Sequence, residues 1–584
     1  MNTTATPFSS PFLHVLNTNH SANKEEAEKI TALLDLPQQE LRQLDTDIAQ
    51  LEESLNKLRV KRDVLRSFID GHHALLSPFR RLPEDILREI FLRCLDPYPV
   101  RSTKQAPLLL TTICRSWRDI ALTTPRLWCS IHIYLPHLNA MNMRVADDIG
   151  WQKIQERRAG VELWLGRSGS VPLSFSLSFG YGARWGSSMI DDREAQMDMM
   201  MQSVLDTFIQ HHTRWKEVRF GGTVTGSHII GSLDVLKPDD IPLLETLDLS
   251  LSVWDVDWSP HRIDSLLRAP LLHRLNLSTR GDRFVDLPVK WEQMTELTIC
   301  SHSFPAFTPV DALKVLSFTH RNIRKCTFFV DAPFTIDPPN YIEAFPSARI
   351  HLLALETLEL EFRNNEIGNG NDDRIACQDI SAFMAVLSCP RLKHLVISGN
   401  MPTATENPPL GQFLARSDCI LTSFNTNLVM NTEAMERTLQ HMPSLNTLSI
   451  HRASFYTTDE ARTSLNALTS VDQNSELLCP CLQHLCVRDV DPAHAGVVLG
   501  VVRVRLDLPE AAQLKSVHAS FSSYPGESYR SEVEEFRRLG LDIHWAFPKF
   551  SSGDEEDLPE DDHPFLSLHP FLSLRLDLDY MDTY

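Results

Sequence analysis

The sequence lacks the features that mark three large classes of protein. No stretch approaches the ~18 uninterrupted apolar residues that a membrane-crossing helix needs, and the apolar run at residues 12–16 is too short for a secretory signal. The eleven cysteines are odd in number and have no framework spacing, which is typical of a reducing compartment. The net charge of −20 argues against general nucleic-acid binding, which needs a basic face. We therefore expect an intracellular protein, cytoplasmic and/or nuclear, that binds neither membrane nor nucleic acid.

The sequence also lacks the short motifs of catalysis. It contains no G-x-x-x-x-G-K-[ST], no G-x-G-x-x-G and no H-E-x-x-H. Cys479, Cys481, His484 and Cys486 are the nearest approach to a metal site. They overlap a regular strand pattern, whereas zinc sites hold paired ligands on turns. The sequence therefore predicts no catalytic residue, no metal site and no cofactor.

Two segments with wide apolar faces lie between residues 75 and 131. Leu82-Pro83 opens the first, since proline suits the first helical position, where its missing N–H would have no partner. Apolar residues then recur at helical spacing, and a second helical set ends at Thr124-Pro125, where the proline stops the helix. A unit this small is marginal alone. Composition leaves two readings open: the first helical layer of a larger domain, or a docking module.

The residues themselves favour the docking module. The blocks L-P-E-D-I-L-x-x-I-F, C-R-x-W-R-x-I-A and P-x-L-W together resemble the F-box, which docks onto the Skp-type adaptor of cullin-based ubiquitin ligases. One departure is the long connection Asp96–Ala106, which contains two prolines. The resemblance implies an adaptor-binding surface built from Leu82, Pro83, Ile86, Leu87, Ile90, Phe91, Ile113, Cys114, Trp117, Ile120, Pro125, Leu127 and Trp128.

Residues 24–70, ahead of this motif, predict one long helix with a heptad repeat. Steps of three and four residues give a narrow seam that suits a coiled coil, with Arg62 as its one flaw. The alternative is a single amphipathic helix that folds back on its own domain. We favour the coiled coil, expect self-association through 41–69, and expect the helix to end at Gly71-His72-His73. The seam positions are Leu41, Leu44, Ile48, Leu51, Leu55, Leu58, Arg62, Leu65 and Ile69.

Beyond residue 151 one phrase recurs: apolar, two residues, apolar, one residue, apolar. Weaker copies start at Leu421 and Leu514, and an alternating strand pattern at 173–179 precedes the array. The copies recur about every thirty residues, near the upper end of the leucine-rich-repeat range. They are Trp215/Val218/Phe220, Leu244/Leu247/Leu249, Leu272/Leu275/Leu277, Met294/Leu297/Ile299, Leu313/Leu316/Phe318, Leu355/Leu358/Leu360, Leu392/Leu395/Ile397, Leu445/Leu448/Ile450 and Leu482/Leu485/Val487.

A single repeat of this kind cannot bury its apolar face, so successive strand–helix units stack into one continuous core. The array resembles a degenerate leucine-rich repeat, although it lacks the usual turn asparagine. The alternative is an irregular α/β domain with a coincidental leucine pattern. The predicted fold class is α/β: a small all-helical F-box, then an irregular leucine-rich-repeat solenoid with a curved parallel sheet and outer helices, preceded by the N-terminal coiled-coil helix.

These assignments divide the chain into six segments. The last of them is strongly acidic, since residues 551–584 contain ten acidic residues and one arginine. The segments are a disordered N-terminus at 1–23, the coiled-coil helix at 24–70, the F-box at 75–131, a linker at 132–150, the repeat domain at 151–546 and an acidic disordered tail at 547–584.

A docking module joined to a long curved surface makes an adaptor. By resemblance, the chain would be the substrate receptor of an SCF-type ubiquitin ligase, held through the Skp-type adaptor to a cullin, with the repeats holding an unknown protein target. The alternative is an interaction scaffold that uses the same partner without directing ubiquitination. The residue between the last two apolar positions of each phrase faces the open side of the sheet. These candidate target-binding residues are Arg219, Asp248, Asn276, Thr298, Ser317, Glu359, Val396, Ser449 and Cys486.

Overall fold

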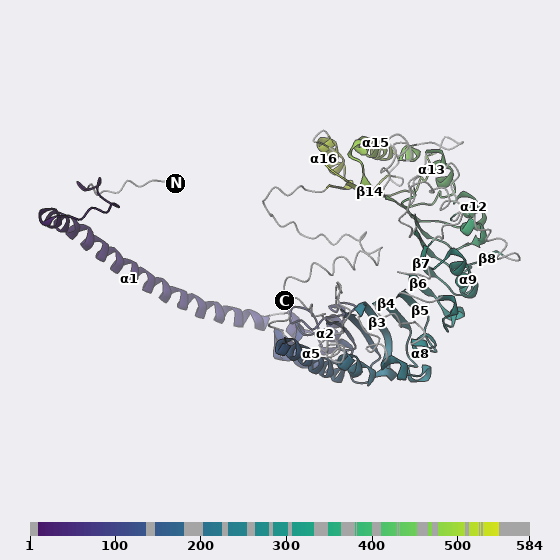
Figure 1. Ribbon diagram of the computed structural model, residues 1–584, viewed down its shortest axis with the longest axis horizontal. Coiled ribbons are helices and arrows are strands. Elements are labelled where there is room, and N and C mark those ends of the chain that lie inside the picture. Colours follow the sequence, from purple (N-terminus) through teal and green to yellow (C-terminus); the bar gives the residue numbers. More distant parts are fainter. Residues whose placement is uncertain are drawn as a thin grey trace. The chain divides into compact units, whose positions relative to one another are not determined.

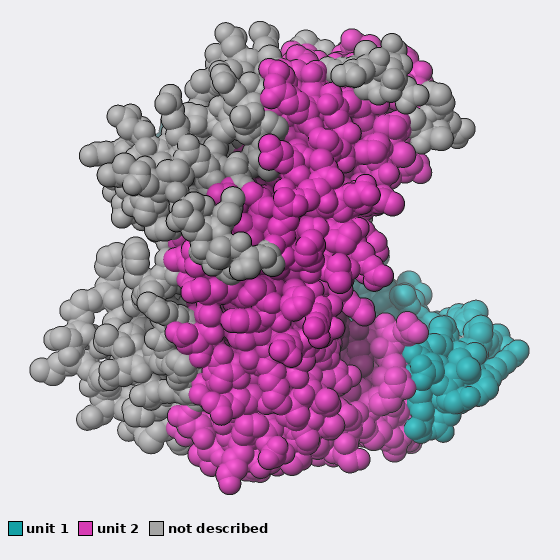
Figure 2. Space-filling model, turned by 90° about the vertical axis from the view of Figure 1, so that its right-hand side faces the viewer, with its two compact units in different colours: residues 1–90 teal, residues 91–584 magenta. Residues whose placement is uncertain are grey.

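The computed structural model consists of two compact units, residues 1–90 and 91–584 (Figure 2). The division falls inside one helix, α2 (Glu84–Arg93), which carries the first block of the expected docking motif. Of the two segments expected to be disordered, 1–23 and 547–584, residues 1–9 of the first and 548–584 of the second lie outside the described residues. The structure describes residues 10–547 apart from 77, 136–146, 180–201, 225–231, 254–262, 280–283, 302–306, 332–348, 364–379, 381, 400–409, 429, 431, 452–464, 470–476, 509–512, 525 and 527–528.

The first unit is dominated by the helix α1 (Lys24–Leu76). Asn23 caps its start, because the Asn23 side chain accepts a hydrogen bond from the Glu26 backbone N–H while the Glu26 carboxylate accepts one from the Asn23 N–H, both at 2.9 Å. The predicted end at Gly71-His72-His73 is wrong, since the helix continues through these residues to Leu76. One glycine costs a helix only about 1 kcal/mol relative to alanine, so it does not by itself end one.

The first unit also holds the start of the motif. The short helix η1 (Pro78–Arg81) precedes α2, and the Leu87 N–H donates to the Pro83 carbonyl at 3.1 Å. Pro83 therefore stands at the beginning of the helix, as its sequence position predicted.

The second unit contains a parallel sheet of fourteen strands that follow one another in chain order. The protein is therefore mixed α/β, as predicted. Strands β8 (Ile350–His351) and β10 (Leu387–Ser388) form a separate pair. The strands of the large sheet are β1 (Ser130–Leu135), β2 (Leu173–Phe179), β3 (Trp215–Val224), β4 (Thr246–Val253), β5 (Arg274–Thr279), β6 (Glu296–Ser301), β7 (Lys325–Asp331), β9 (Thr357–Arg363), β11 (His394–Gly399), β12 (Ser423–Thr426), β13 (Thr447–His451), β14 (His484–Val490), β15 (Ser516–Phe521) and β16 (Asp542–Ala546).

Helices connect these strands and lie on the outer side of the curved sheet (Figure 1). Each connection carries the chain back to the end of the sheet at which the strands begin, as the joining of parallel strands requires. The helices of this unit, besides short 3-10 turns, include α3 (Leu110–Ile113), α4 (Arg115–Leu122), α5 (Asp147–Arg167), α8 (Asp264–Leu267), α9 (Pro309–Thr319), α12 (Gly411–Ser417), α13 (Thr432–Leu439), α15 (Ala495–Leu506) and α16 (Arg530–Arg538), and residues 202–209 and 382–386 are also helical.

Apolar side chains in register form the core of the sheet. Side chains alternate between the two faces of a strand, so one in-register position gives one continuous row. The middle position of the repeated phrase forms such a row across all fourteen strands, and each of its side chains is at most 3% exposed. The row runs Ile131, Phe175, Val218, Leu247, Leu275, Leu297, Cys326, Leu358, Leu395, Phe424, Leu448, Leu485, Val517 and Ile543.

One predicted repeat lies on a helix instead. Leu313, Leu316 and Phe318 belong to α9, which begins with a capping box between Thr308 and Asp311. Apolar residues at i and i+3 suit a helix face as well as the strand phrase. The strand of this repeat is β7, and its phrase is Ile323/Cys326/Phe328, all fully buried.

The sheet also begins earlier than residue 151. Strand β1 runs from Ser130 to Leu135, across the expected boundary between motif and linker, and pairs with β2. Its sequence S-I-H-I-Y-L alternates apolar and polar residues, which is the pattern of a half-buried strand.

Arginine side chains tie successive layers of this unit together. Arg214 donates to the Val171 carbonyl at 2.9 and 2.7 Å, and Arg416 donates to the carbonyls of Met384 and Leu387. Arg505 is fully buried and donates to the carbonyls of Leu468, Leu478 and Cys479. Each guanidinium satisfies carbonyl groups of the preceding layer that would otherwise lack partners.

Candidate functional site

The expected adaptor-binding residues of the first unit differ in exposure. Pro83 is exposed and Ile86 is 45% exposed, whereas Leu82 and Ile90 are half-buried and Leu87 is buried. Ile86 and Pro83 therefore present apolar surface that this unit does not cover.

Four expected adaptor-binding residues of the second unit are buried: Phe91, Ile120, Leu127 and Trp128. The Phe91 and Trp117 rings lie 4.9 Å apart. The Trp128 indole N–H donates to the Ala121 carbonyl at 2.8 Å, and its ring meets that of Trp164 on α5 edge-on at 4.8 Å. These side chains pack the fold, so a partner cannot reach them without opening it.

Ile113, Cys114, Trp117 and Pro125 form the accessible remainder of that set. The sequence predicted one helical stripe through Ile113, Cys114 and Trp117, but the helix is interrupted at Cys114, whose backbone is extended between α3 and α4. The Cys114 sulfur accepts a hydrogen bond from the Trp117 backbone N–H at 3.5 Å. Ile113, at the end of α3, is 55% exposed, while Trp117 is half-buried.

The long connection Asp96–Ala106 has a structural role. The Pro97 carbonyl accepts a hydrogen bond from the Ser130 hydroxyl at 2.6 Å, and the Pro99 carbonyl accepts one from the His132 N–H at 2.9 Å. The connection therefore lies along β1, where it covers backbone groups of an edge strand.

The expected target-binding residues, with one exception, lie in one row of the sheet, which we call the concave row. Ser317 is the exception: it lies on α9, where its hydroxyl donates to the Lys314 carbonyl at 2.6 Å, and Thr327 of β7 occupies the corresponding place in the row. Sequence reasoning also missed five further members. The row runs His132, Ser176, Arg219, Asp248, Asn276, Thr298, Thr327, Glu359, Val396, Asn425, Ser449, Cys486, His518 and His544.

Charged groups at the β3–β9 part of this face pair with one another. The Arg219 guanidinium lies over the Tyr98 ring, 4.5 Å from its centroid, and the Tyr98 hydroxyl donates to the Glu217 carboxylate at 2.9 Å. Burial raises the pKa of Tyr98 to about 12, with Arg219 opposing the shift. Burial also raises the pKa of Asp248, although the Ser250 hydroxyl donates to its carboxylate at 2.7 Å. The sequence pattern did not predict Tyr98 on this face, because Tyr98 belongs to the connection Asp96–Ala106, which has no periodic pattern.

A second pair of opposite charges lies on the neighbouring strands β7 and β9. The Thr327 hydroxyl donates to the Glu359 carboxylate at 2.9 Å, and the Lys325 ammonium lies 3.5 Å from the same carboxylate. This part of the face therefore carries internally balanced charge rather than a patch of one sign.

Histidines gather on the same face at β13–β16. The Ser449 hydroxyl and His451 Nε2 lie 3.0 Å apart, and His484 Nδ1 lies 2.8 Å from the Ser516 hydroxyl. The rings of His518 and His544 stack at 4.5 Å with 13° between their planes. His518 lies within the weaker repeat copy that starts at Leu514, and His544 lies on the last strand, so their places in the row depended on a register that the sequence left uncertain.

Neither a protein-family model nor a curated protein matches this chain.

Among the described residues, no three His, Cys, Asp or Glu side chains are placed to hold a metal ion. The Cys479 thiol instead lies 3.8 Å from the Leu439 carbonyl, and Cys486 is buried on β14. No helix in the described part of the chain is long and apolar enough to cross a membrane.

Proposed function

We propose that this chain is the substrate receptor of an SCF-type ubiquitin ligase, in which the F-box binds a Skp-type adaptor and the concave row binds a protein target. The observation that carries the proposal is the division of the motif's apolar residues. Leu87, Phe91, Leu127 and Trp128 are buried in the fold, whereas Ile86 and Ile113 are 45% and 55% exposed. Apolar anchors of this kind dominate the energy of most protein interfaces.

The proposed mechanism is proximity. The adaptor and cullin would hold the receptor near the charged ubiquitin-conjugating enzyme, and the concave row would hold the target. Tethering raises the effective concentration of the target's lysines at the enzyme. The chain itself supplies no catalytic group in this scheme.

Ile113→Asp tests the adaptor surface against a matched control. Ile113 is 55% exposed and Leu353, elsewhere in the same unit, is 57% exposed. We expect Ile113→Asp to abolish co-purification with a Skp-type adaptor and Leu353→Asp to leave it unchanged. Equal binding by both variants would contradict the proposal.

Leu82→Ala combined with Pro83→Ala tests the first unit in the same assay. Pro83 is exposed and Leu82 half-buried, so the change removes little core packing. Trp117→Ala is a poorer test, because the Phe91 ring packs against Trp117 and the variant would also disturb the fold. We expect the double variant to lose the adaptor while retaining its target. Adaptor binding by a folded double variant would argue against the F-box assignment.

Arginine substitutions in the concave row test target binding. Thr298 and Ser449 are half-buried members of the row, and Ser317 is a half-buried serine on α9. We expect Thr298→Arg and Ser449→Arg to remove proteins that proximity labelling detects with the whole wild-type chain, and Ser317→Arg to retain them. Loss with Ser317→Arg alone would place the target on the helices instead.

The alternative function is a non-catalytic scaffold that binds the adaptor without directing ubiquitination. Reconstituting the complex with a co-purified target separates the two functions. Ubiquitin transfer that depends on the concave row supports the receptor, and adaptor binding without any transfer supports the scaffold.

A further inference from the structure

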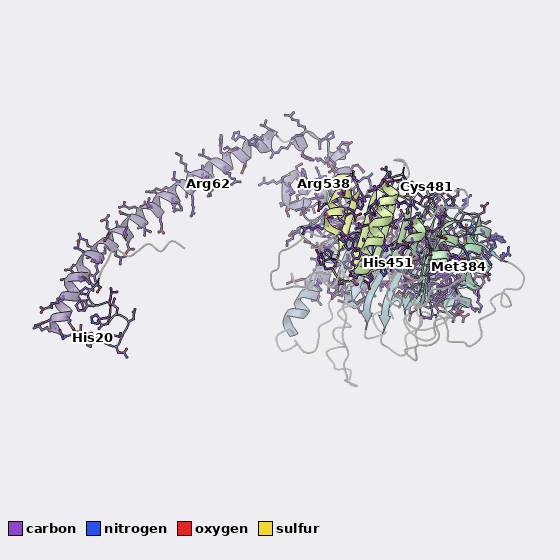
Figure 3. The ribbon with its side chains drawn as sticks, turned by 90° about the horizontal axis from the view of Figure 1, so that it is seen from above. His20, Arg62, Met384, His451, Cys481 and Arg538 are labelled. Carbon is purple, nitrogen blue, oxygen red and sulfur yellow. The ribbon has the colours of Figure 1, made fainter. Side chains whose placement is uncertain are left out.

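The heptad seam of α1 is exposed along its whole length. Its eight leucine and isoleucine side chains between Leu41 and Ile69 are each 48–69% exposed. Arg62 also lies on the seam and pairs on the surface with the adjacent Asp63 at 2.6 Å (Figure 3). An apolar stripe of this length, interrupted only at Arg62, is the surface that a second helix covers in a coiled coil.

The charges that flank the seam are separated into two blocks. In the first half every charged flanking residue is acidic, and in the second half every charged flanking residue through Arg66 is basic. Ser54 lies between the blocks, and all these positions are exposed. The acidic block is Glu40, Asp45, Asp47 and Glu52, and the basic block is Arg59, Lys61 and Arg66.

This separation distinguishes the two ways of pairing two copies. Flanking residues meet across a coiled coil and set partner choice and orientation. In a parallel pair in register, the acidic block would face the partner's acidic block, the basic block would face the basic block, and Arg62 would face the partner's arginine in the core. In an antiparallel pair each acidic block faces a basic block, and Arg62 lies level with the acidic half of the other helix.

We propose that two copies of this chain pair in antiparallel orientation through residues 41–69 of α1. The paired stretch is about 43 Å long at 1.5 Å per residue. The two chains then leave the pair beyond Leu76 at opposite ends of it. The pairing goes beyond the proposed ligase function and does not depend on it.

Crosslinking of the full-length wild-type chain tests the orientation directly. A zero-length carbodiimide reagent joins lysine amines to carboxylates that they touch. Lys61 and Asp47 are about 21 Å apart along one helix, so a link between them must join two chains. We expect a mass of two chains, and links from Lys61 to the acidic block between isotopically heavy and light copies. A monomer at high micromolar concentration, or a pair without such links, overturns the proposal.

Charge reversal provides an independent test in the same full-length chain. Asp45→Lys/Asp47→Lys/Glu52→Lys reverses the charge of three of the four residues of the acidic block, and Arg59→Glu/Lys61→Glu/Arg66→Glu makes both blocks acidic. We expect each triple variant to weaken self-association about tenfold or more. The variant that combines all six substitutions should restore it. These exposed changes keep good helix formers, so helix content by circular dichroism should not fall. Unchanged affinity in both triple variants would indicate a parallel pair and contradict the proposal.

Discussion

The sheet of the second unit and the helix α1 of the first carry similar apolar side chains in opposite environments. Leu358 in the sheet has no exposed surface, whereas Leu51 on α1 is 69% exposed. In the sheet each strand finds its partner in the next stretch of the same chain, so the apolar rows close within one molecule. Among the described residues of the first unit, no second apolar helix lies beside the seam of α1, and we propose that a second copy of the chain covers it.

Alanine substitution at these two leucines should give the largest contrast. We expect Leu358→Ala to reduce the free energy of unfolding by about 3 kcal/mol, because it leaves a cavity in a closed row. Leu51→Ala removes side-chain atoms that already contact water, so in a dilute monomer it should change stability by less than about 0.5 kcal/mol. Denaturant unfolding of both variants checks this, and equal losses would mean that the seam is packed within the chain.

Arg505→Met should have the next largest effect. The side chain is fully buried, and its removal leaves the carbonyls of Leu468, Leu478 and Cys479 without their donor. We expect a loss of about 2 kcal/mol. Arg505→Lys is the matched control, and it should recover only part of the loss because an ammonium group lacks the planar fork. A thermal melt in which both variants match the wild type would show that the bonds add nothing to stability.

Asp248→Asn should have a smaller effect that depends on pH. Burial raises the pKa of Asp248 in the folded chain above its unfolded value of about 3.9. The folded chain holds this proton more tightly, so the wild type loses stability relative to the variant as pH rises through the folded pKa. We expect the variant to melt at a higher temperature at pH 7, and this gain to disappear in acid. A lower melting temperature at pH 7 would mean that Arg219 compensates the buried charge fully.

Ile113→Ala should change stability least. The side chain is more than half exposed, so the free energy of unfolding should shift by no more than about 0.5 kcal/mol. Thermal melting of the variant beside Phe91→Ala, at a fully buried position of the same motif, checks the division between exposed and packing residues. Comparable losses from the two variants would mean that Ile113 is part of the core.

The sequence predicted those parts of the fold in which a residue's pattern and its environment agree. Leu247, Leu275 and Leu297 could be placed because one spacing repeats and every copy faces the same core. Leu313 and Leu316 were wrongly assigned to a strand, because their spacing also fits a helix. The capping box at Thr308 and Asp311 is the signal that identifies the helix. The true strand phrase has Cys326 at its centre, where a leucine was expected.

The residues of the candidate site could be proposed from the sequence, but which of them are exposed could not. Ile86 and Leu87 are neighbours with the same apolar character, yet one is exposed and the other buried. Only the packing of neighbouring elements decides which side of a short helix is covered. Tyr98 could not be placed at all, since a tyrosine in a connecting segment carries no periodic signal.

The order of the strands in the sheet has a consequence for synthesis of the chain. Every strand from β2 to β16 in the large sheet adds beside one that precedes it in the sequence. As the chain leaves the ribosome, each new strand meets an edge that is already present, and the pairing spans one repeat rather than the whole domain. A large domain built in this way can fold progressively during translation, because no strand must wait for a partner near the far end of the chain.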